Sequence, residues 1–389
     1  MTISVQARRY DTSEPVSIEI ADRRITRIVP AWPSGTVDDW PLVAPAFFDL
    51  QINGHGGTWF SSDSLTADDV IRTLEPHFAF GITRLCPTLI TASFEALSAG
   101  FAAIDEACRR HDWVEAMVPG CHLEGPYISP VVGPRGAHPL EHVRAADYDE
   151  FSRLQETAGG RIRLVTLAAE SDGAVEFIQR VTNDGVIVAI GHTAAEPEQI
   201  AAAVDAGARL STHLGNGAHG TIRRHPNYIW EQLADPRLWA SIITDGHHLP
   251  ESVIRTILRT KSAQRTIITC DAAGLAGCPP GVYDEGSMQV EILEDGRIVL
   301  AGQSQLLAGS SLQTDTCVAH AISAAGVSRR EAFDMAGLNP ARLLNFETIE
   351  LKPGSRADLV FFHHDGPGHP LRITATLFQG AVRFGTLPG

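Results

Sequence analysis

Four side chains that could carry out a hydrolysis share one pattern in this sequence. Glu124, His192, His213 and Asp271 each end a short apolar run, close to a glycine or proline turn. A carboxylate with two imidazoles gives three protein ligands for a divalent ion and leaves one position for water. Such an ion lowers the pKa of its water, and a further carboxylate can take the water's proton and return it to a leaving amine. If these runs are neighbouring strands, the four residues predict a metal-dependent hydrolase site.

The alternative is that each residue only caps a strand or bonds to a loop. For one residue alone the two interpretations are about equally good. The recurrence of one arrangement at four places favours the site, with Glu124, His192 and His213 as ligands and Asp271 as general base and acid.

The first apolar run of the central region contributes amides rather than histidines. Gln51 and Asn53 are two residues apart, so a strand places them on one face. Amides are weak metal ligands compared with imidazole, and we therefore expect one ion per chain. His55 follows among glycines and is a candidate substrate contact, although its context favours a histidine in a surface loop.

Eight strand-like runs alternate with helical segments in the middle of the chain. Helical spacing with an early proline marks residues 197–206 and 250–258. Eight strand–helix units predict a (β/α)8 barrel, with an open doubly wound sheet as the alternative. No G-x-G-x-x-G follows a strand, which disfavours a dinucleotide site. The runs are 43–52, 82–89, 118–123, 162–167, 186–190, 209–213, 239–244 and 265–270.

At both ends of the chain apolar and polar residues alternate, as they do in short antiparallel strands. We therefore predict a small β-sandwich domain formed by residues 1–44 and 346–389, flanking a barrel of residues 45–345. After the eighth strand we expect a helix over 312–325, N-capped by Ser310 or Ser311. A second helix is expected over 329–344, broken at Asn339-Pro340.

Charge and composition limit the class of partner. The 389 residues carry a formal net charge of −15, which disfavours nucleic acid and anionic membranes. No apolar run is long enough to span a bilayer, and the first residues lack a signal-peptide pattern. The six cysteines are scattered without a CxxC pair, so we expect a reducing, cytoplasmic location.

These residues lie in motifs that resemble the amidohydrolase superfamily, and within it the N-acetylglucosamine-6-phosphate deacetylases. HLEGP, together with the later GH, THL and DA positions, is the most specific part, and the likeness covers most of the chain. The motifs are residues 45–57 (PAFFDLQINGHGG), 122–126 (HLEGP), 136–139 (GAHP), 166–170 (TLAAE), 191–192 (GH), 212–214 (THL), 245–248 (DGHH), 269–272 (TCDA) and 307–312 (LAGSSL).

The resemblance implies a barrel with a flanking β-sandwich and a homodimer. It also implies the ligand and acid/base roles given above, and one divalent ion, with zinc expected first and iron, manganese or cobalt as alternatives. By the same resemblance His138 contacts the acetamido carbonyl and His248 holds the sugar, with His247 beside it as a further candidate. Arg224 aligns roughly with an arginine that meets the substrate phosphate.

One loop departs from the family pattern. The family usually has Asn-Ala directly after the Thr-His-Leu-x segment, where this chain has Asn216, Gly217 and Ala218 in LGNGAHG. The following TIRRHPNYIW also differs from the usual Arg-x-Pro-Gly. These positions recognise sugar and phosphate, so the chemistry is better supported than the 6-phosphate.

We therefore expect an enzyme that removes the acetyl group from an N-acetyl amino sugar, N-acetylglucosamine-6-phosphate or a close relative. The first alternative is an amidohydrolase of an unphosphorylated N-acyl amino sugar or an N-acyl amino acid. The second is a non-catalytic protein that kept the barrel, which metal content would distinguish.

Overall fold

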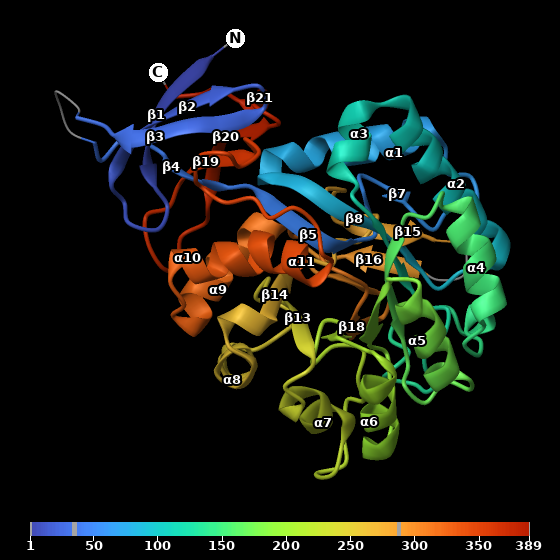
Figure 1. Ribbon diagram of the computed structural model, residues 1–389. Coiled ribbons are helices and arrows are strands. Elements are labelled where there is room, and N and C mark those ends of the chain that lie inside the picture. Colours follow the sequence, from blue (N-terminus) through green and yellow to red (C-terminus); the bar gives the residue numbers. More distant parts are fainter. Residues whose placement is uncertain (1, 33–36, 286–288, 389) are drawn as a thin grey trace.

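A parallel eight-stranded barrel forms the centre of the molecule (Figure 1). The computed structural model describes residues 2–32, 37–285 and 289–388. The strands are apolar and almost wholly buried, as expected for parallel strands covered by helices. In sheet order they are β5 (Phe47–Ile52), β8 (Ile82–Ile90), β9 (Cys121–Glu124), β10 (Ile162–Leu167), β11 (Ile187–Ile190), β12 (Leu210–Ser211), β13 (Trp239–Ile243) and β14 (Thr266–Thr269). This confirms the barrel and excludes the open sheet.

The seam between β14 and β5 is closed by backbone and side-chain hydrogen bonds, and the buried Asp49 accepts several of the side-chain ones. Ile52 and Ala272 form a parallel bridge, and Asn53 N donates to Ala272 O at 2.8 Å. The Asp49 carboxylate accepts hydrogen bonds from both sides of the seam. Its donors are the Thr269 hydroxyl, Cys270 N at 2.9 Å, Thr314 Oγ1 at 2.7 Å and Gln51 N at 3.0 Å.

Helices surround the barrel and pack apolar faces on the strands (Figure 1). The predicted helix over 197–206 is confirmed, with Pro197 in its first turn as expected. The helices are α1 (Ala67–Leu74), α2 (Phe94–Arg110), α3 (Asp112–Met117), α4 (Tyr148–Thr157), α5 (Ala174–Asn183), α6 (Pro197–Ala206), α7 (Tyr228–Ala234), α8 (Glu251–Lys261), α9 (Thr314–Ala325), α10 (Arg329–Phe333) and α11 (Asn339–Leu343).

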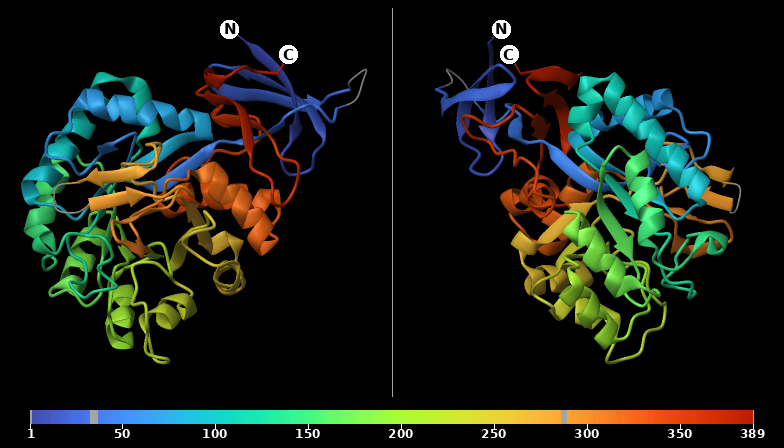
Figure 2. Two further views of the ribbon diagram at one scale, coloured as in Figure 1. Left: turned by 180° about the vertical axis from the view of Figure 1, so that it is seen from behind. Right: turned by 45° about the vertical axis from the view of Figure 1, so that its right-hand side comes forward.

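Strands from both ends of the chain form one seven-stranded sheet beside the barrel, with the two termini close together (Figures 1 and 2). The sheet follows the alternating pattern of the sequence, with Val16, Ile18 and Ile20 buried on one face. Its order is β21 (Ala381–Gly385), β20 (Arg372–Phe378), β19 (Leu359–His363), β4 (Leu42–Pro45), β1 (Ile3–Arg9), β2 (Pro15–Ala21) and β3 (Arg24–Pro30).

A four-stranded antiparallel sheet is inserted between β14 and α9, in gold and orange in Figure 2. The sequence analysis assigned nothing to this segment. Its β-branched runs around Asp295-Gly296 are a hairpin signal that could have revealed it. Its strands are β15 (Gly281–Asp284), β16 (Gln289–Ile292), β17 (Ile298–Leu300) and β18 (Gln303–Leu307), and a two-stranded ribbon joins β6 (Gly54–His55) to β7 (Thr58–Trp59).

Two expectations about the last helices are wrong. Helix α9 begins at Thr314 with Gln313 as its N-cap, because the Ser310 hydroxyl donates to Asp245 Oδ2 instead. The chain also does not break at Pro340: α10 and α11 are joined by a π-helical stretch, Asp334–Leu338, and Pro340 lies in the first turn of α11. Within the described residues, no helix is both long and apolar enough to cross a membrane.

We predict that Asp49→Ala lowers the free energy of unfolding by about 3 kcal/mol or more, because it leaves several buried donors without an acceptor. Chemical denaturation checks this, with the exposed Asp63→Ala as the matched control. A loss as small as that of the control would show that Asp49 does not hold the seam.

Candidate active site

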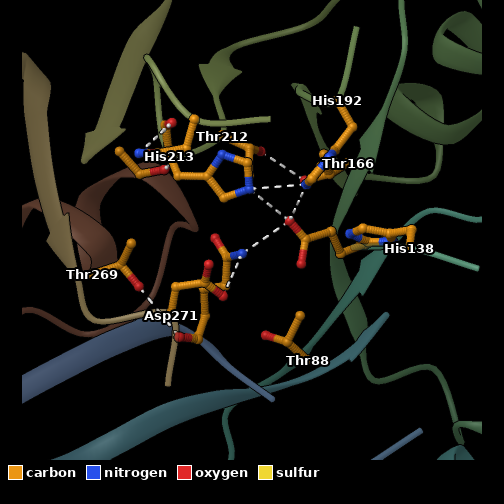
Figure 3. Close-up of polar contacts among 12 residues, drawn as sticks. Thr88, His138, Thr166, His192, Thr212, His213, Thr269 and Asp271 are labelled. Carbon is orange, nitrogen blue, oxygen red and sulfur yellow. Dashed lines mark hydrogen bonds and ion pairs between the residues drawn. The ribbon is translucent and has the colours of Figure 1, made fainter. Parts of the chain in front are cut away.

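The carboxyl ends of the barrel strands bring the four predicted residues together, and Figure 3 labels His192, His213 and Asp271 among them. Glu124 is the last residue of β9, and His192, His213 and Asp271 each follow the end of a strand by two residues. Glu124, His192 and His213 are buried, and Asp271 is half-buried. Chain segments separated by about 150 residues therefore meet at one end of the barrel, where such barrels place their chemistry.

Three of these residues have an unusual backbone conformation. His192, His213 and Asp271 have φ values of +49°, +30° and +51°, in the left-handed region that residues with a Cβ rarely adopt. Strained conformations of this kind persist where the surrounding structure enforces them, commonly at active sites. Each strand therefore ends in an abrupt turn at the residue that carries the functional side chain.

The ligand atoms of Glu124, His192 and His213 form a tight triangle. Glu124 Oε1 lies 2.9 Å from His213 Nε2 and 3.3 Å from His192 Nε2, and the two nitrogens are 3.1 Å apart. Two ligands about 2.1 Å from one ion at tetrahedral angles lie roughly 3.4 Å apart. The triangle is thus only slightly smaller than a tetrahedral metal site requires.

The second nitrogen of His192 supports the same interpretation. His192 Nδ1 lies 2.8 Å from the Pro134 carbonyl oxygen, which can only accept, so Nδ1 carries the hydrogen. In the neutral ring Nε2 is then a bare lone pair directed at Glu124 and His213. A backbone carbonyl that fixes the tautomer in this way is the usual support of a metal-bound histidine. The three residues therefore fit one divalent ion.

The two carboxylates of the site, Glu124 and Asp271, have pKa values that are shifted in opposite directions. Burial alone would raise the pKa of Glu124, but the hydrogen bonds and charges of His192 and His213 outweigh burial and hold that pKa well below its usual range. Burial, and then the nearby charge of Glu124, raise the pKa of Asp271 to about 7. Glu124 is thus a permanent anion, and Asp271 is poised to exchange a proton.

The amides of Gln51 in β5 and of Asn53, just after it, hold these carboxylates in place. Gln51 Nε2 donates to Glu124 Oε1 at 2.9 Å and to Asp271 Oδ1 at 3.0 Å, and Asn53 Nδ2 donates to Asp271 Oδ1 at 2.8 Å. Both donors meet the same oxygen of Asp271, which leaves Oδ2 for a proton.

Buried side chains next to the ligands form a hydrogen-bonded layer, of which Figure 3 labels Thr166 and Thr212. His122 Nε2 lies 2.8 Å from Thr166 Oγ1, which lies 2.7 Å from Thr212 Oγ1. A Cβ on Gly191 would come within 2.8 Å of both threonine side chains, so only glycine fits next to His192. The sequence analysis gave this layer no role.

A cavity of about 920 Å³ opens above the site. Most of the predicted substrate-binding residues line it, together with the inserted sheet and the loop that follows His213. The predicted residues on its wall are Asn53, His138, Asn216, Gly217, Ala218, His247 and His248.

Two cavity histidines are held by defined partners. His138 Nδ1 lies 2.8 Å from Thr91 Oγ1, and burial, then the neighbouring His192, lower the pKa of His138 to about 3, so this ring is neutral near pH 7. His248 Nδ1 lies 2.8 Å from Asp245 Oδ2. Burial would raise the pKa of Asp245, but the bonds from His248 and its backbone lower it.

Comparison with known proteins identifies the family. The model of the amidohydrolase family matches residues 42–384. The chain belongs to this family. It is 35% identical to an N-acetylgalactosamine-6-phosphate deacetylase from Escherichia coli O157:H7, over 92% of this chain and 95% of the relative. It is 33% identical to the N-acetylglucosamine-6-phosphate deacetylase of Bos taurus, over 88% of this chain and 83% of the relative.

A solved structure of a deacetylase superposes on this chain over almost its whole length. The N-acetyl-D-glucosamine-6-phosphate deacetylase of Mycobacterium smegmatis superposes with a TM-score of 0.86 at 31% identity, covering 98% of this chain and 99% of that one. A variant of the Mycobacterium smegmatis enzyme has been solved in complex with N-acetyl-D-glucosamine-6-phosphate. The resemblance deduced from the motifs is therefore confirmed.

Two of the predicted substrate contacts of this amidohydrolase, His55 and Arg224, lie off the cavity wall. His55 packs beside His77 and Phe80, with ring centroids 5.2 and 6.1 Å away, and Gln313 Nε2 is 3.4 Å from its Nδ1. Arg224 is exposed and does not line the cavity of its own chain. Its role at a phosphate remains a prediction.

Other parts of the wall were not predicted from the sequence. The inserted sheet contributes Val290 and the segment 305–307. Thr91 and Asp245, which orient His138 and His248, were not assigned roles because a supporting partner has no spacing signature of its own. Asp245 could have been suspected, since it ends a strand in the same way as the four residues of the site.

We predict that Glu124→Gln and His192→Asn each lose the divalent ion together with activity, because a site with three protein ligands has none to spare. Metal analysis of the purified variants checks this. Full metal occupancy in either variant would contradict the ligand assignment.

We predict that Asp271→Asn keeps fold and metal but lowers kcat by about 100-fold or more, because an amide cannot accept the proton. In the wild type, kcat/KM should fall as the pH is lowered through the pKa of Asp271. A cation beside the carboxylate will hold that pKa below 7.

A pH–rate profile with the same acidic limb in the Asn variant would assign that limb to another group. Turnover close to wild type at normal metal content would remove Asp271 from the reaction.

Proposed function

We propose that this amidohydrolase is a deacetylase of N-acetyl amino sugars that takes an N-acetylhexosamine 6-phosphate as substrate. The observation that carries the proposal is the buried Glu124–His192–His213 triangle with Asp271 hydrogen-bonded beside it. Its relatives, named as deacetylases of two epimeric sugars, match over most of their length.

The reaction is the hydrolysis of the acetamido C–N bond. A divalent ion held by Glu124, His192 and His213 would polarise the acetyl carbonyl and lower the pKa of a water molecule. Asp271 accepts the proton of the attacking water and then delivers it to the nitrogen as the C–N bond breaks, giving acetate and the free amino sugar. The hydrogen bonds from Gln51 and Asn53 keep Asp271 oriented through both proton transfers.

The neutral ring of His138 is suited to donate a hydrogen bond to the acetyl carbonyl oxygen of the substrate. If the Thr91 hydroxyl donates to Nδ1, Nε2 carries a hydrogen and can stabilise negative charge that develops on that oxygen. His248 on the cavity wall, fixed by Asp245, is placed to hold a hydroxyl of the sugar.

We propose one ion per chain, with zinc expected first and iron, manganese or cobalt as alternatives. The amides of Gln51 and Asn53 occupy the side of Glu124 and Asp271 where a second ion would need stronger ligands. The donor set of one carboxylate and two imidazoles suits several divalent metals, so metal identity needs direct measurement.

We also propose a homodimer and a cytoplasmic location. Val132 and Trp230 are apolar side chains with 77% and 51% of their surface exposed, which a second copy could cover. In such a dimer the exposed Arg224 would be available to the cavity of the second copy. The six cysteines, all free, suit a reducing compartment.

The cavity itself favours one alternative. Within the described residues, its wall contains no lysine or arginine and includes the carboxylates Asp69, Asp284 and Glu285. A single chain therefore offers no permanent cation to a phosphate, and an unphosphorylated N-acyl amino sugar is the second candidate substrate. An N-acyl amino acid is a weaker candidate because a single chain offers no permanent cation to its carboxylate either.

The function is tested by supplying the metal-loaded enzyme with N-acetylglucosamine, N-acetylgalactosamine and their 6-phosphates, and measuring acetate release. For a 6-phosphate substrate we predict that Arg224→Ala raises KM by about 10-fold to 100-fold, as for a lost hydrogen bond to a charged group of roughly 1.5–3 kcal/mol. The adjacent exposed Arg223→Ala is the matched control.

The unphosphorylated sugars should be cleaved equally well by wild type and Arg224→Ala. Preference of the wild type for an unphosphorylated sugar would remove the phosphate from the proposal. Failure to cleave any of the four would remove the sugar class.

A further inference from the structure

The loop after His213 supplies a continuous stretch of the cavity wall, residues 215–220, and its one ionisable side chain is His219. His219 is half-buried and is fixed by Tyr228, the first residue of α7. The Tyr228 hydroxyl lies 2.9 Å from the backbone N of His219 and 2.9 Å from its Nδ1. This is the loop in which the sequence departs from its family.

The two bonds to one hydroxyl select a tautomer. The Tyr228 oxygen accepts the backbone N–H of His219, since that N–H can only donate. The hydroxyl hydrogen of this buried tyrosine then needs an acceptor, and within the described residues Nδ1 of His219 is the one it meets. With Nδ1 accepting, the neutral ring carries its hydrogen on Nε2, which is left as a donor.

The loop is anchored at both ends, so the ring has a fixed place. A Cβ on Gly217 would lie 2.8 Å from His192 Nδ1, and one on Gly133 would lie 2.9 Å from the Cα of His219. Asn227 Nδ2 donates to the carbonyls of Arg223 and Arg224 at 2.9 and 3.1 Å. These contacts hold the loop in place between His192, a proposed metal ligand, and His219.

The charges on the wall decide which part of a sugar His219 can meet. The acetamido group must lie at Glu124 and Asp271, so the opposite side of the pyranose ring, with the oxygens on carbons 4 and 6, points along the wall. Other parts of the wall carry the carboxylates Asp69, Asp284 and Glu285. An anionic group such as a phosphate is disfavoured beside these carboxylates, whereas the N–H of His219 can donate to a hydroxyl or a phosphate oxygen.

We propose that His219 is a specificity-determining residue, donating from Nε2 to a substrate oxygen on the side of the sugar away from the acetamido group, either a hydroxyl or the phosphate on it. Tyr228 is the positioning residue that fixes the tautomer. The proposal rests on the proposed deacetylase function.

The test is a double-mutant cycle on the metal-loaded enzyme with His219→Ala, Tyr228→Phe and the double variant, assayed on one sugar with and without its 6-phosphate. His219→Ala should raise KM about 10-fold to 100-fold where the oxygen is a phosphate, and about 2-fold to 10-fold where it is a hydroxyl. We expect kcat within about 2-fold and unchanged metal content.

Among the described residues, the Tyr228 hydroxyl bonds only the ring and the backbone N–H of His219, so Tyr228→Phe should raise KM less than His219→Ala does, and its effect in the double variant should be much smaller than in the wild type. His219→Gln, which keeps an N–H donor, should recover part of the loss. The exposed Thr221→Ala, in the same loop, is the matched control and should behave as wild type. Thermal unfolding midpoints show whether each variant is folded.

An unchanged KM for His219→Ala on both forms of the sugar, in an enzyme that is active, overturns the proposal. A full additional effect of Tyr228→Phe in the double variant overturns the positioning role. Absence of deacetylation by the wild type is a different result, because it removes the proposed function and this inference with it.

Discussion

The structure around the site depends on keeping one carboxylate, Glu124, ionised out of water. An isolated buried charge costs several kcal/mol, and the cost is offset only where hydrogen bonds and opposite charge surround it. Here His192, His213 and Gln51 all meet the same oxygen, at 2.9 to 3.3 Å. These partners come from three other strand ends, so the anion can be stabilised only when the barrel is closed.

Closure of the barrel depends in turn on a second buried carboxylate, Asp49, whose role is structural. Asp49 is saturated by donors from β5, β14 and α9, so it has no free lone pair directed at a ligand. Asp271, two residues beyond β14, receives donors on one oxygen only. The same functional group therefore holds the seam in one case and exchanges protons in the other, and the number of donors around it makes the difference.

Much of this arrangement is visible in the sequence, because strand ends are local features. Apolar runs that stop at a single polar residue identify Glu124, His192, His213 and Asp271, and eight such strands predict the barrel. The supporting parts depend on contacts between distant segments. The positive φ angles at three site residues, the His122–Thr166–Thr212 layer and the capture of Ser310 by Asp245 follow from packing that no local pattern encodes.

The residues that carry out hydrolysis and those that contact the rest of the sugar lie on different parts of the structure, the strand ends and the loops of the cavity rim. Ligand atoms within about 3 Å of one another constrain every strand that carries them, whereas a loop beyond a strand end is free to change its outward side chains. In this chain the loop after His213 still packs against His192 through Gly217, yet it presents His219 to the cavity and Arg224 to solvent. The deacetylase relatives act on epimers that differ away from the acetamido group. A fixed hydrolytic centre with a separate rim loop is an arrangement that would allow such a change of sugar without any change in the hydrolytic step.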